Sequence, residues 1–390
     1  MTRLARRIAG ALALGILPLS ALGATVATAD ATAGASSAQA AKRAPSIHLK
    51  ALPPIAQAGV APAASSRGSL ISARFKPLST GQVATLQTLT AAGTWQTVTT
   101  TTVDGLGYAN FTGAANGHYR VVGAGAVSKT VKAKLRRPAF RDEFSGTRLN
   151  ARKWATYNIG YNKGGLRTCA KPGAAYSVAD GTVRLGIRKD PRKLGKVCRY
   201  RTRKGMANAP WLLNTQLTTV GKFEFKYGVV AARVKFQPAR GSHVGTWIQS
   251  LRYRKPNRPA TGVELDYGEY FGRGGQVDAL GAFLYMSGPN MRTMKLGGLM
   301  PRTNRLIPPG HTWWNSYHVV SAEWRKSGYT LRIDGRVFWK TKKWVSRSWQ
   351  YLVLSNLSSD YELKYLTPQS FAEPAHVDWV RVWTRKAYVR

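Results

Sequence analysis

Short runs of alternating apolar and polar residues follow one another from residue 47 to the end of the chain, and no long segment has helical periodicity. Alternation with a period of two is typical of β-strands that bury one face. Between residues 47 and 134 the runs are separated by turn sequences, namely Ala92-Gly93, Asp104-Gly105 and Asn116-Gly117. Because glycine-containing dipeptides of this kind favour tight turns between strands, the pattern predicts an all-β chain.

The runs divide into two predicted domains of unequal size. Residues 47–134 suffice for a small β-sandwich, and their order of strands and turns resembles the immunoglobulin-like modules of bacterial surface proteins. This module contains one acidic residue, Asp104, and no group of residues suited to catalysis. We therefore expect it to act as a spacer or tether for the second, larger domain. Of the 12 tryptophans, all except Trp95 lie beyond residue 150. Residues 138–390 are strand-rich throughout, and about 250 residues of this kind fit a large antiparallel jelly-roll sandwich, concanavalin-like in type.

Residues 1–29 have the three-part layout of a secretory signal: a basic start, an apolar run and small residues. We expect cleavage after Ala29, with Ala33 and Ala40 as alternatives. An Ala/Ser/Thr-rich, flexible leader is predicted over residues 30–46. The protein is therefore expected to be secreted, extracellular or cell-wall associated, with no membrane span after cleavage. An uncleaved membrane anchor is the alternative.

The predicted export affects the expected redox state of the two cysteines, Cys169 and Cys198. Oxidising compartments favour disulfide bonds, so we predict that this pair is bridged. Two buried thiols are the alternative.

The formal net charge is +42, which implies attraction to anionic partners such as acidic cell-wall polymers, sulfated or uronic glycans, or nucleic acid. The densest basic segment, residues 188–204, has no recognisable nucleic-acid motif. We therefore expect a solvated basic loop there and no specific nucleic-acid site. The predicted protein is a monomer.

The chain has only 17 acidic residues, yet three of them, Glu264, Asp266 and Glu269, lie close together. In a strand, residues two apart share a face, so Glu264 and Asp266 point the same way. Glu269 joins them only if one residue is inserted as a β-bulge, and Gly268 is the residue type that tolerates such a backbone. The spacing thus predicts a bulged strand with three carboxyl groups on one face.

Two carboxyl groups on one face are what glycosidic cleavage needs. A retaining mechanism places them about 5–5.5 Å apart, one as nucleophile and one as acid/base. The long side chains of Glu264 and Glu269 can lean together, while Asp266 shares hydrogen bonds and charge between them. Crowding raises one pKa and keeps one carboxyl group protonated. The alternative is a structural or calcium-binding acidic patch.

The region from residue 140 to residue 385 resembles family sixteen of the glycoside hydrolases, which includes laminarinases, lichenases, agarases and xyloglucan-modifying enzymes. Glu264 to Glu269 matches the bulged E-x-D-x-x-E motif of its laminarinase-like branch. Further blocks in the family's order lie at residues 140–147, 178–183, 225–235, 314–318, 323–324 and 377–382.

The resemblance implies Glu264 as nucleophile, Asp266 as its helper and Glu269 as acid/base. It also implies sugar stacking on Trp247, for which a plain core position is the alternative. His243, where many relatives have Trp, is expected to face the cleft and contact substrate.

Relatives often bind structural calcium, and Asp378, Glu143 and the Gly181 backbone match those positions; six oxygen ligands are usually needed. No other cofactor is expected.

Departures from the family pattern border the substrate cleft and leave the substrate open: residues 166–169, 281–285 and 356–360. The predicted activity is endo-acting, retaining hydrolysis of β-1,3- or mixed β-1,3/1,4-glucan. The alternatives are an acidic polysaccharide as substrate, transglycosylation, and a non-catalytic glycan-binding protein.

Overall fold

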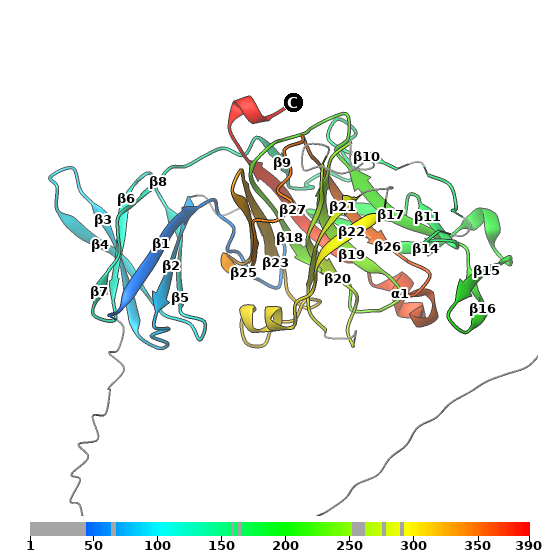
Figure 1. Cartoon of the computed structure of the whole chain (residues 1–390), viewed down its shortest axis with the longest axis horizontal. Coiled ribbons are helices and arrows are strands. Elements are labelled where there is room, and N and C mark those ends of the chain that lie inside the picture. Colours follow the sequence, from blue (N-terminus) through cyan, green and yellow to red (C-terminus); the bar gives the residue numbers. More distant parts are fainter. Residues whose placement is uncertain are drawn as a thin grey trace, which may run out of the picture. The chain divides into compact units, whose positions relative to one another are not determined.

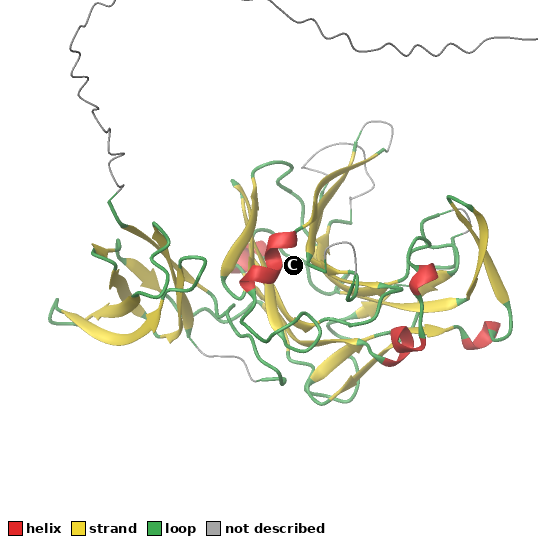
Figure 2. Cartoon of the chain, turned by 90° about the horizontal axis from the view of Figure 1, so that it is seen from below, coloured by secondary structure: helices red, strands yellow, loops and turns green. Residues whose placement is uncertain are grey.

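The computed structural model describes residues 44–63, 68–157, 159–162, 165–251, 262–274, 278–288 and 292–390. These residues form antiparallel sheets almost throughout, as Figures 1 and 2 show, and the predicted all-β class is confirmed. The predicted signal (residues 1–29) and all but the last residues of the predicted leader (30–46) lie outside the described residues. Within the ranges given above, no helix is long and apolar enough to span a bilayer.

The N-terminal module is a small sandwich of two sheets, as predicted. Its core lies between them and includes Ile71, Phe75, Leu86, Phe111 and Val121. Its immunoglobulin-like affiliation stays a prediction. One sheet contains β1 (Ser46–Leu52), β2 (Ser69–Lys76) and β5 (Tyr108–Ala114), and the other contains β3 (Val83–Leu89), β4 (Trp95–Thr102), β6 (Gly117–Gly123), β7 (Ala126–Val127) and β8 (Val131–Ala133).

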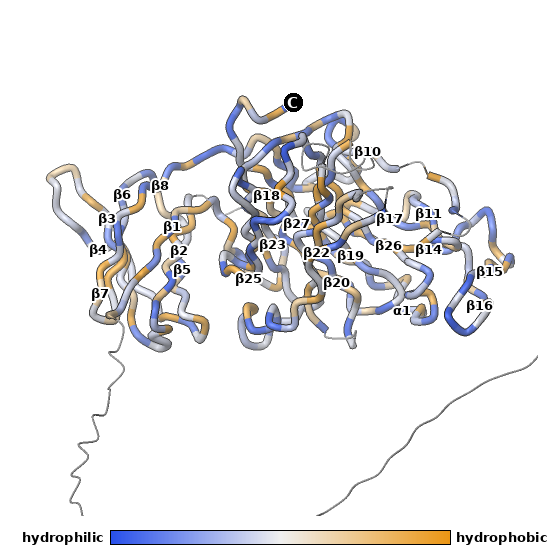
Figure 3. The backbone as a smooth tube through the Cα atoms, in the orientation of Figure 1, coloured by the Kyte–Doolittle hydropathy of each residue, from blue (hydrophilic) through white to orange (hydrophobic). Residues whose placement is uncertain are grey.

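The large domain is built from two stacked sheets, here called the inner and the outer sheet. Figure 3 shows hydrophobic and hydrophilic segments mixed along the chain, and buried hydrophobic residues of the large domain meet in one continuous core between the sheets. The inner sheet contains β10 (Ala155–Thr156), β11 (Ala170–Pro172), β14 (Ile187–Lys189), β17 (Leu212–Thr218), β19 (His243–Gln249), β20 (Glu264–Tyr270), β21 (Gly281–Ser287), β22 (Thr293–Leu299) and β26 (Tyr351–Leu357). The outer sheet contains β9 (Phe140–Asp142), β12 (Tyr176–Ala179), β13 (Thr182–Leu185), β18 (Gly228–Lys235), β23 (His318–Arg325), β24 (Gly328–Ile333), β25 (Arg336–Thr341) and β27 (Ala375–Trp383).

A separate hairpin of β15 (Val197–Thr202) and β16 (Gly205–Pro210) projects from the large domain. Cys198 on β15 forms a disulfide with Cys169, as predicted. The basic segment 188–204 was expected to be a loop, but much of it is strand, because Val197 to Thr202 pairs along its whole length with β16.

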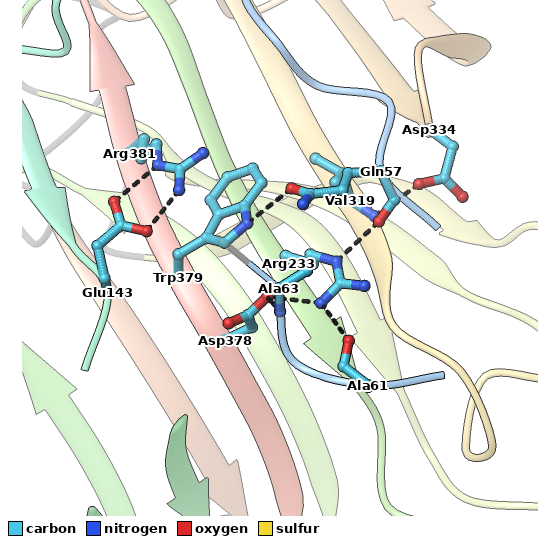
Figure 4. Close-up of polar contacts among 10 residues, drawn as sticks. All are labelled: Gln57, Ala61, Ala63, Glu143, Arg233, Val319, Asp334, Asp378, Trp379 and Arg381. Carbon is cyan, nitrogen blue, oxygen red and sulfur yellow. Dashed lines mark hydrogen bonds and ion pairs between the residues drawn. The ribbon is translucent and has the colours of Figure 1, made fainter. Parts of the chain in front are cut away.

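The connection between β1 and β2 crosses the outer face of the outer sheet, and we call residues 53–63 the strap (Figure 4). Gly59 and Tyr317 exchange backbone hydrogen bonds of 3.1 and 2.6 Å. Trp379 Nε1 donates to Gln57 Oε1 over 3.2 Å. Apolar residues of both domains bury each other beside the strap, namely Leu52, Ile55, Leu70, Val229, Ala231, Val319, Trp379 and Trp383. The N-terminal module therefore packs on the large domain through this shared surface, and its role as a spacer or tether stays a prediction.

A buried carboxylate strengthens the same contact. Glu323 on β23 accepts hydrogen bonds from Lys50 of the N-terminal module over 3.3 Å and from Arg332 over 2.7 Å, and it also pairs with Arg325. Burial disfavours its charged form, but Arg332 and Lys50 outweigh burial and hold the pKa of Glu323 at about 2.

We expect Glu323→Gln to lower the free energy of unfolding by about 3 kcal/mol at pH 7, because a pKa depressed from 4.5 to about 2 stabilises the charged, folded state. This stabilisation is complete above pH 4.5 and is lost as the pH falls towards 2. Urea unfolding of wild type and variant at pH 7 and pH 3.5 tests it. The difference in the free energy of unfolding between wild type and variant should be smaller at pH 3.5 than at pH 7. An equal difference at both pH values would show that the ionised form of Glu323 is not the source of the stabilisation.

Candidate active site

Strand β20 carries the three clustered acids and contains the predicted bulge. Against β19 its register shifts by one position, so that Tyr267 has no partner while Asp266 and Gly268 do. Against β21 the register shifts between Asp266 and Glu269. Gly268 does not have a left-handed backbone here. It matters because a Cβ at this position would lie 3.2 Å from side-chain atoms of Thr246 on β19 and of Val320 on β23 of the outer sheet.

The bulge places the three carboxyl groups on the face of the inner sheet that points away from the core. Leu265, Tyr267 and Tyr270 all belong to the core between the sheets. The acids alternate with them and therefore occupy the opposite face, which we call the acid face. A Cβ built on Gly245, the β19 partner of Glu269, would lie 3.5 Å from Glu269 Oε1 on that face.

Glu264 is the terminus of a hydrogen-bond relay that runs across the acid face. Gln249 Nε2 donates to Glu264 Oε2. Tyr351 Oη donates to Gln249 Oε1 over 2.5 Å, and Tyr157 Oη lies 2.8 Å from Tyr351 Oη. Hydrogen bonds to the charged form favour that form, so the relay suits a carboxylate at Glu264.

Asp266 and Glu269 have the opposite character. Asp266 is 2% exposed, and its Oδ2 has no hydrogen-bond partner within the described structure. Burial, followed by the neighbouring charges of Glu264 and Glu269, raises the pKa of Asp266 well above its usual value. Burial also raises the pKa of Glu269. The acid face therefore combines Glu264, which accepts a hydrogen bond from Gln249, with two carboxyl groups whose pKa values are raised by burial.

Trp247 lies on the acid face but is only 8% exposed. Its Nε1 donates to Ser355 Oγ over 2.9 Å, and its ring packs with Tyr351 and Val353 in a small cluster outside the main core. The indole is thus fixed in orientation beside the acids, and its stacking on sugar stays a prediction.

His243 is buried rather than open to a ligand. Its Nδ1 lies 2.7 Å from Glu362 Oε2, and its ring stacks on Phe271 with 5.0 Å between centroids. Although burial works against the charged form, Glu362 raises the pKa of His243 through charge and hydrogen bonding. The charge of His243 in turn favours ionised Glu269 and partly offsets the larger effect of burial, which raises the pKa of Glu269. His243 therefore acts electrostatically on Glu269, and its direct contact with substrate stays a prediction.

Residues 171–352, which include the bulged strand and its neighbours, match the family described as Glycosyl hydrolases family 16. These residues are a family 16 glycosyl hydrolase domain.

The chain has low sequence identity to a curated relative and to several solved structures. Glucan endo-1,3-beta-glucosidase A1 of Niallia circulans is 24% identical over 229 residues, which is 53% of this chain and 30% of the relative. The chain therefore spans under a third of that protein's length. Among solved structures, the endo-beta-1,3-glucanase from Pyrococcus furiosus is 19% identical, with a TM-score of 0.46, covering 64% of this chain and 94% of that one. The laminarinase catalytic domain from Thermotoga maritima MSB8 is 18% identical, with a TM-score of 0.47, covering 64% and 98%.

The residues expected to hold calcium in the large domain do not fit a metal ion. Asp378 Oδ2 accepts hydrogen bonds from Arg233 Nη1 over 2.5 Å and from the Ala63 amide over 3.2 Å, and Arg381 Nε donates to Glu143 Oε1 over 2.9 Å (Figure 4). Guanidinium groups already neutralise both carboxylates and would repel a dication. Among the described residues, no group of three potential side-chain ligands comes together, and Gly181 lies in the turn between β12 and β13. The calcium prediction is therefore not supported here.

Sequence reasoning missed Gln249, Glu362, Arg167 and Lys295. Gln249 follows Trp247 at the strand spacing of two, so alternation could have placed it on the acid face. Lys295 on β22 and Arg167 both lower the pKa of Glu269, although burial dominates. Arg167 lies beside Thr168, whose amide and hydroxyl donate to Asp360 over 2.8 and 2.7 Å. No local pattern connects these loops, which lie nearly two hundred residues apart.

Proposed function

We propose that this family 16 domain is a retaining, endo-acting hydrolase of β-1,3- or mixed β-1,3/1,4-glucan. The observation that carries the proposal is the bulge in β20, because it puts Glu264 and Glu269 on one face with Asp266 between them. The name of the Niallia circulans relative, a glucan endo-1,3-beta-glucosidase, supports the choice of glucan.

In the proposed first step, the Glu264 carboxylate attacks the anomeric carbon. The glycosidic bond breaks, and its oxygen takes the proton of the Glu269 carboxyl group. In the second step, the Glu269 carboxylate takes a proton from water while the water oxygen attacks the anomeric carbon. Glu264 leaves as a carboxylate, and two inversions give net retention.

The environments support this division of roles. The relay through Gln249 stabilises the charged Glu264 that must attack. Burial raises the pKa of Glu269, which keeps the proton that the leaving group needs. Asp266, with a raised pKa and a buried, unpartnered Oδ2, is proposed to position Glu264 when substrate excludes water.

Product analysis on a glycan panel tests the proposal. With laminarin and lichenan we expect oligosaccharides of mixed length, and proton NMR during the first minutes should show the β-anomer before mutarotation. Initial appearance of the α-anomer would contradict retention. Release of single sugars from chain ends would contradict endo action, and binding without any cleavage would indicate a glycan-binding protein.

His243→Gln is expected to move the basic limb of the pH profile of kcat/KM to higher pH. Loss of the positive charge beside Glu269 removes an influence that lowers its pKa, so the acid stays protonated further into the basic range. The value of kcat at the pH optimum should fall by less than about tenfold, since general acid catalysis itself remains. The matched control is His118→Gln in the N-terminal module, which is exposed and should leave the profile unchanged. A shift to lower pH would contradict the assigned role.

A second candidate substrate is an acidic polysaccharide. Arg167, Lys295 and protonated His243 all act electrostatically on the acid face, and the whole chain carries a net charge of +42. Carrageenan and polygalacturonate therefore belong in the panel. Cleavage of either one at a higher kcat/KM than laminarin would select this candidate.

We also propose that the protein is secreted, on the basis of the signal-like residues 1–29 and a disulfide of the kind formed in oxidising compartments. Expression of the full chain in a secreting bacterial host tests this. Mass spectrometry of protein from the medium should give an N-terminus at Asp30, Gly34 or Ala41, and retention of the whole chain in the membrane fraction would contradict cleavage.

A further inference from the structure

A surface groove with a volume of about 940 Å³ lies at one end of the large domain, beside the short helix α1 (Pro368–Ala372). It is separate from the acid face, and none of the three clustered acids lines it. Its lining includes the end of β18, the start of β27 and residues 364–367, which we call the wall. Its volume is in the range of small-molecule and oligomer sites, roughly 300–1,000 Å³.

The groove is strongly basic. Lys235, Arg240, Arg273, Lys364 and His376 line it, and among its described lining residues the single acid is Glu373. Burial, followed by the charges of Lys235 and Arg184, lowers the pKa of His376 to about 4. The same crowding lowers the pKa of Lys235, through burial first and Arg184 second. At neutral pH His376 is therefore uncharged, and the positive charge of the groove comes from the lysine and arginine side chains that line it.

Aromatic rings accompany these cations. The Arg240 guanidinium lies 3.4 Å from the centroid of the Tyr365 ring, and the Arg273 guanidinium lies 5.6 Å from the centroid of the Trp314 ring. Both rings are partly exposed and line the groove. A flat ring can pack against the apolar face of a sugar, while a guanidinium fixed beside it can bind a carboxylate or sulfate group in two-pronged fashion.

The wall of the groove is connected to the acid face. Glu362, which binds His243 beside Glu269, is followed two residues later by Lys364 of the groove.

We propose that this groove is a second binding site, for a segment of an anionic polysaccharide whose sugars carry carboxylate or sulfate groups. The proposal uses the family 16 assignment, under which polysaccharide is the expected partner, but it does not depend on which glycan the acid face cleaves. The groove would hold the protein on a charged matrix while the acid face acts on a neighbouring chain.

Affinity measurements on the full chain at 0.15 M salt test the site, with polygalacturonate and dextran sulfate as anionic probes and dextran as the neutral probe. The groove variant is the triple substitution Arg240→Gln, Arg273→Gln and Lys364→Gln. The control variant is Arg199→Gln, Arg201→Gln and Lys204→Gln on the exposed β15–β16 hairpin, which removes the same charge.

We expect the groove variant to weaken binding of both anionic probes at least tenfold and the control variant to weaken it less than threefold, with no binding of dextran. Both should keep wild-type thermal stability and wild-type cleavage of a soluble neutral glucan. Equal weakening by the two variants would overturn the proposal, because net charge alone would explain it. Tighter, groove-dependent binding of single-stranded DNA would also overturn it. Tyr365→Ala should weaken glycan binding with all charges present, which separates the site from a purely electrostatic patch.

Discussion

Glu264→Ala should lower kcat on laminarin by about 10⁵-fold, the scale seen when a covalent nucleophile is removed. The variant loses the atom that attacks the anomeric carbon, while Gln249, Tyr351 and the rest of the relay keep their places. Addition of azide should restore turnover of an aryl β-glucoside oligomer and give an α-glycosyl azide, because the small anion enters from the vacated side. Mass spectrometry and NMR of the product check both points.

Glu269→Ala provides the contrast. The decrease in kcat caused by this substitution should depend on the leaving group. On laminarin, where general acid catalysis is needed, kcat should fall by about 10²- to 10⁴-fold. On a substrate with an activated phenol as leaving group, the decrease should be much smaller. Azide should then give a β-glycosyl azide. Asp180→Ala is the control, since that carboxylate is 78% exposed and distant from the chemistry. An α-azide from Glu269→Ala and a β-azide from Glu264→Ala would reverse the assignments, and full activity of either variant would refute the proposed mechanism.

Arg233→Met should lower the free energy of unfolding by about 3–5 kcal/mol, the cost of breaking a buried ion pair from one side. Arg233 and Asp378 have side-chain exposures of only 1% and 6%. Arg233 also donates to the strap, from Nε to the Gln57 carbonyl over 2.7 Å and from Nη1 to the Ala61 carbonyl over 3.0 Å. Without Arg233, the buried Asp378 carboxylate and the two strap carbonyl groups lose this hydrogen-bond donor. Urea unfolding at pH 7 measures the effect.

Arg184→Met is the matched control. Arg184 pairs with Asp180 at the surface, and such pairs contribute about 0–1 kcal/mol. Limited proteolysis adds a local readout, because the strap should become cleavable in Arg233→Met and stay protected in the control. A loss below 1 kcal/mol in Arg233→Met would show that the strap contributes little to stability.

The acid face could be predicted because its information is local. Glu264, Asp266 and Glu269 lie within six positions, and strand alternation with one bulge fixes which way they point. The disulfide followed from having only two cysteines, Cys169 and Cys198, in a chain predicted to be exported.

The strap and the surroundings of His243 could not be predicted in this way. Arg233 and Gln57 are 176 positions apart, and His243 and Glu362 are 119 apart. Neither pair belongs to a repeating pattern, and their contacts depend on how whole sheets stack. The sequence around Arg233 does not indicate that this side chain is buried. The sequence therefore predicted Asp378 as a free metal ligand, whereas Asp378 forms a buried ion pair with Arg233.

The strap also has a practical consequence for how the protein can be divided. A recombinant form beginning at Pro138 would keep every residue of the acid face but would uncover Val229, Val319 and Trp379 and leave Asp378 and Arg233 without their outer cover. Such an exposed apolar surface promotes aggregation. A transfer of the large domain to another protein should therefore include both sandwiches. The suitable cutting point lies before β1, and not between β8 and β9 where the two sandwiches join.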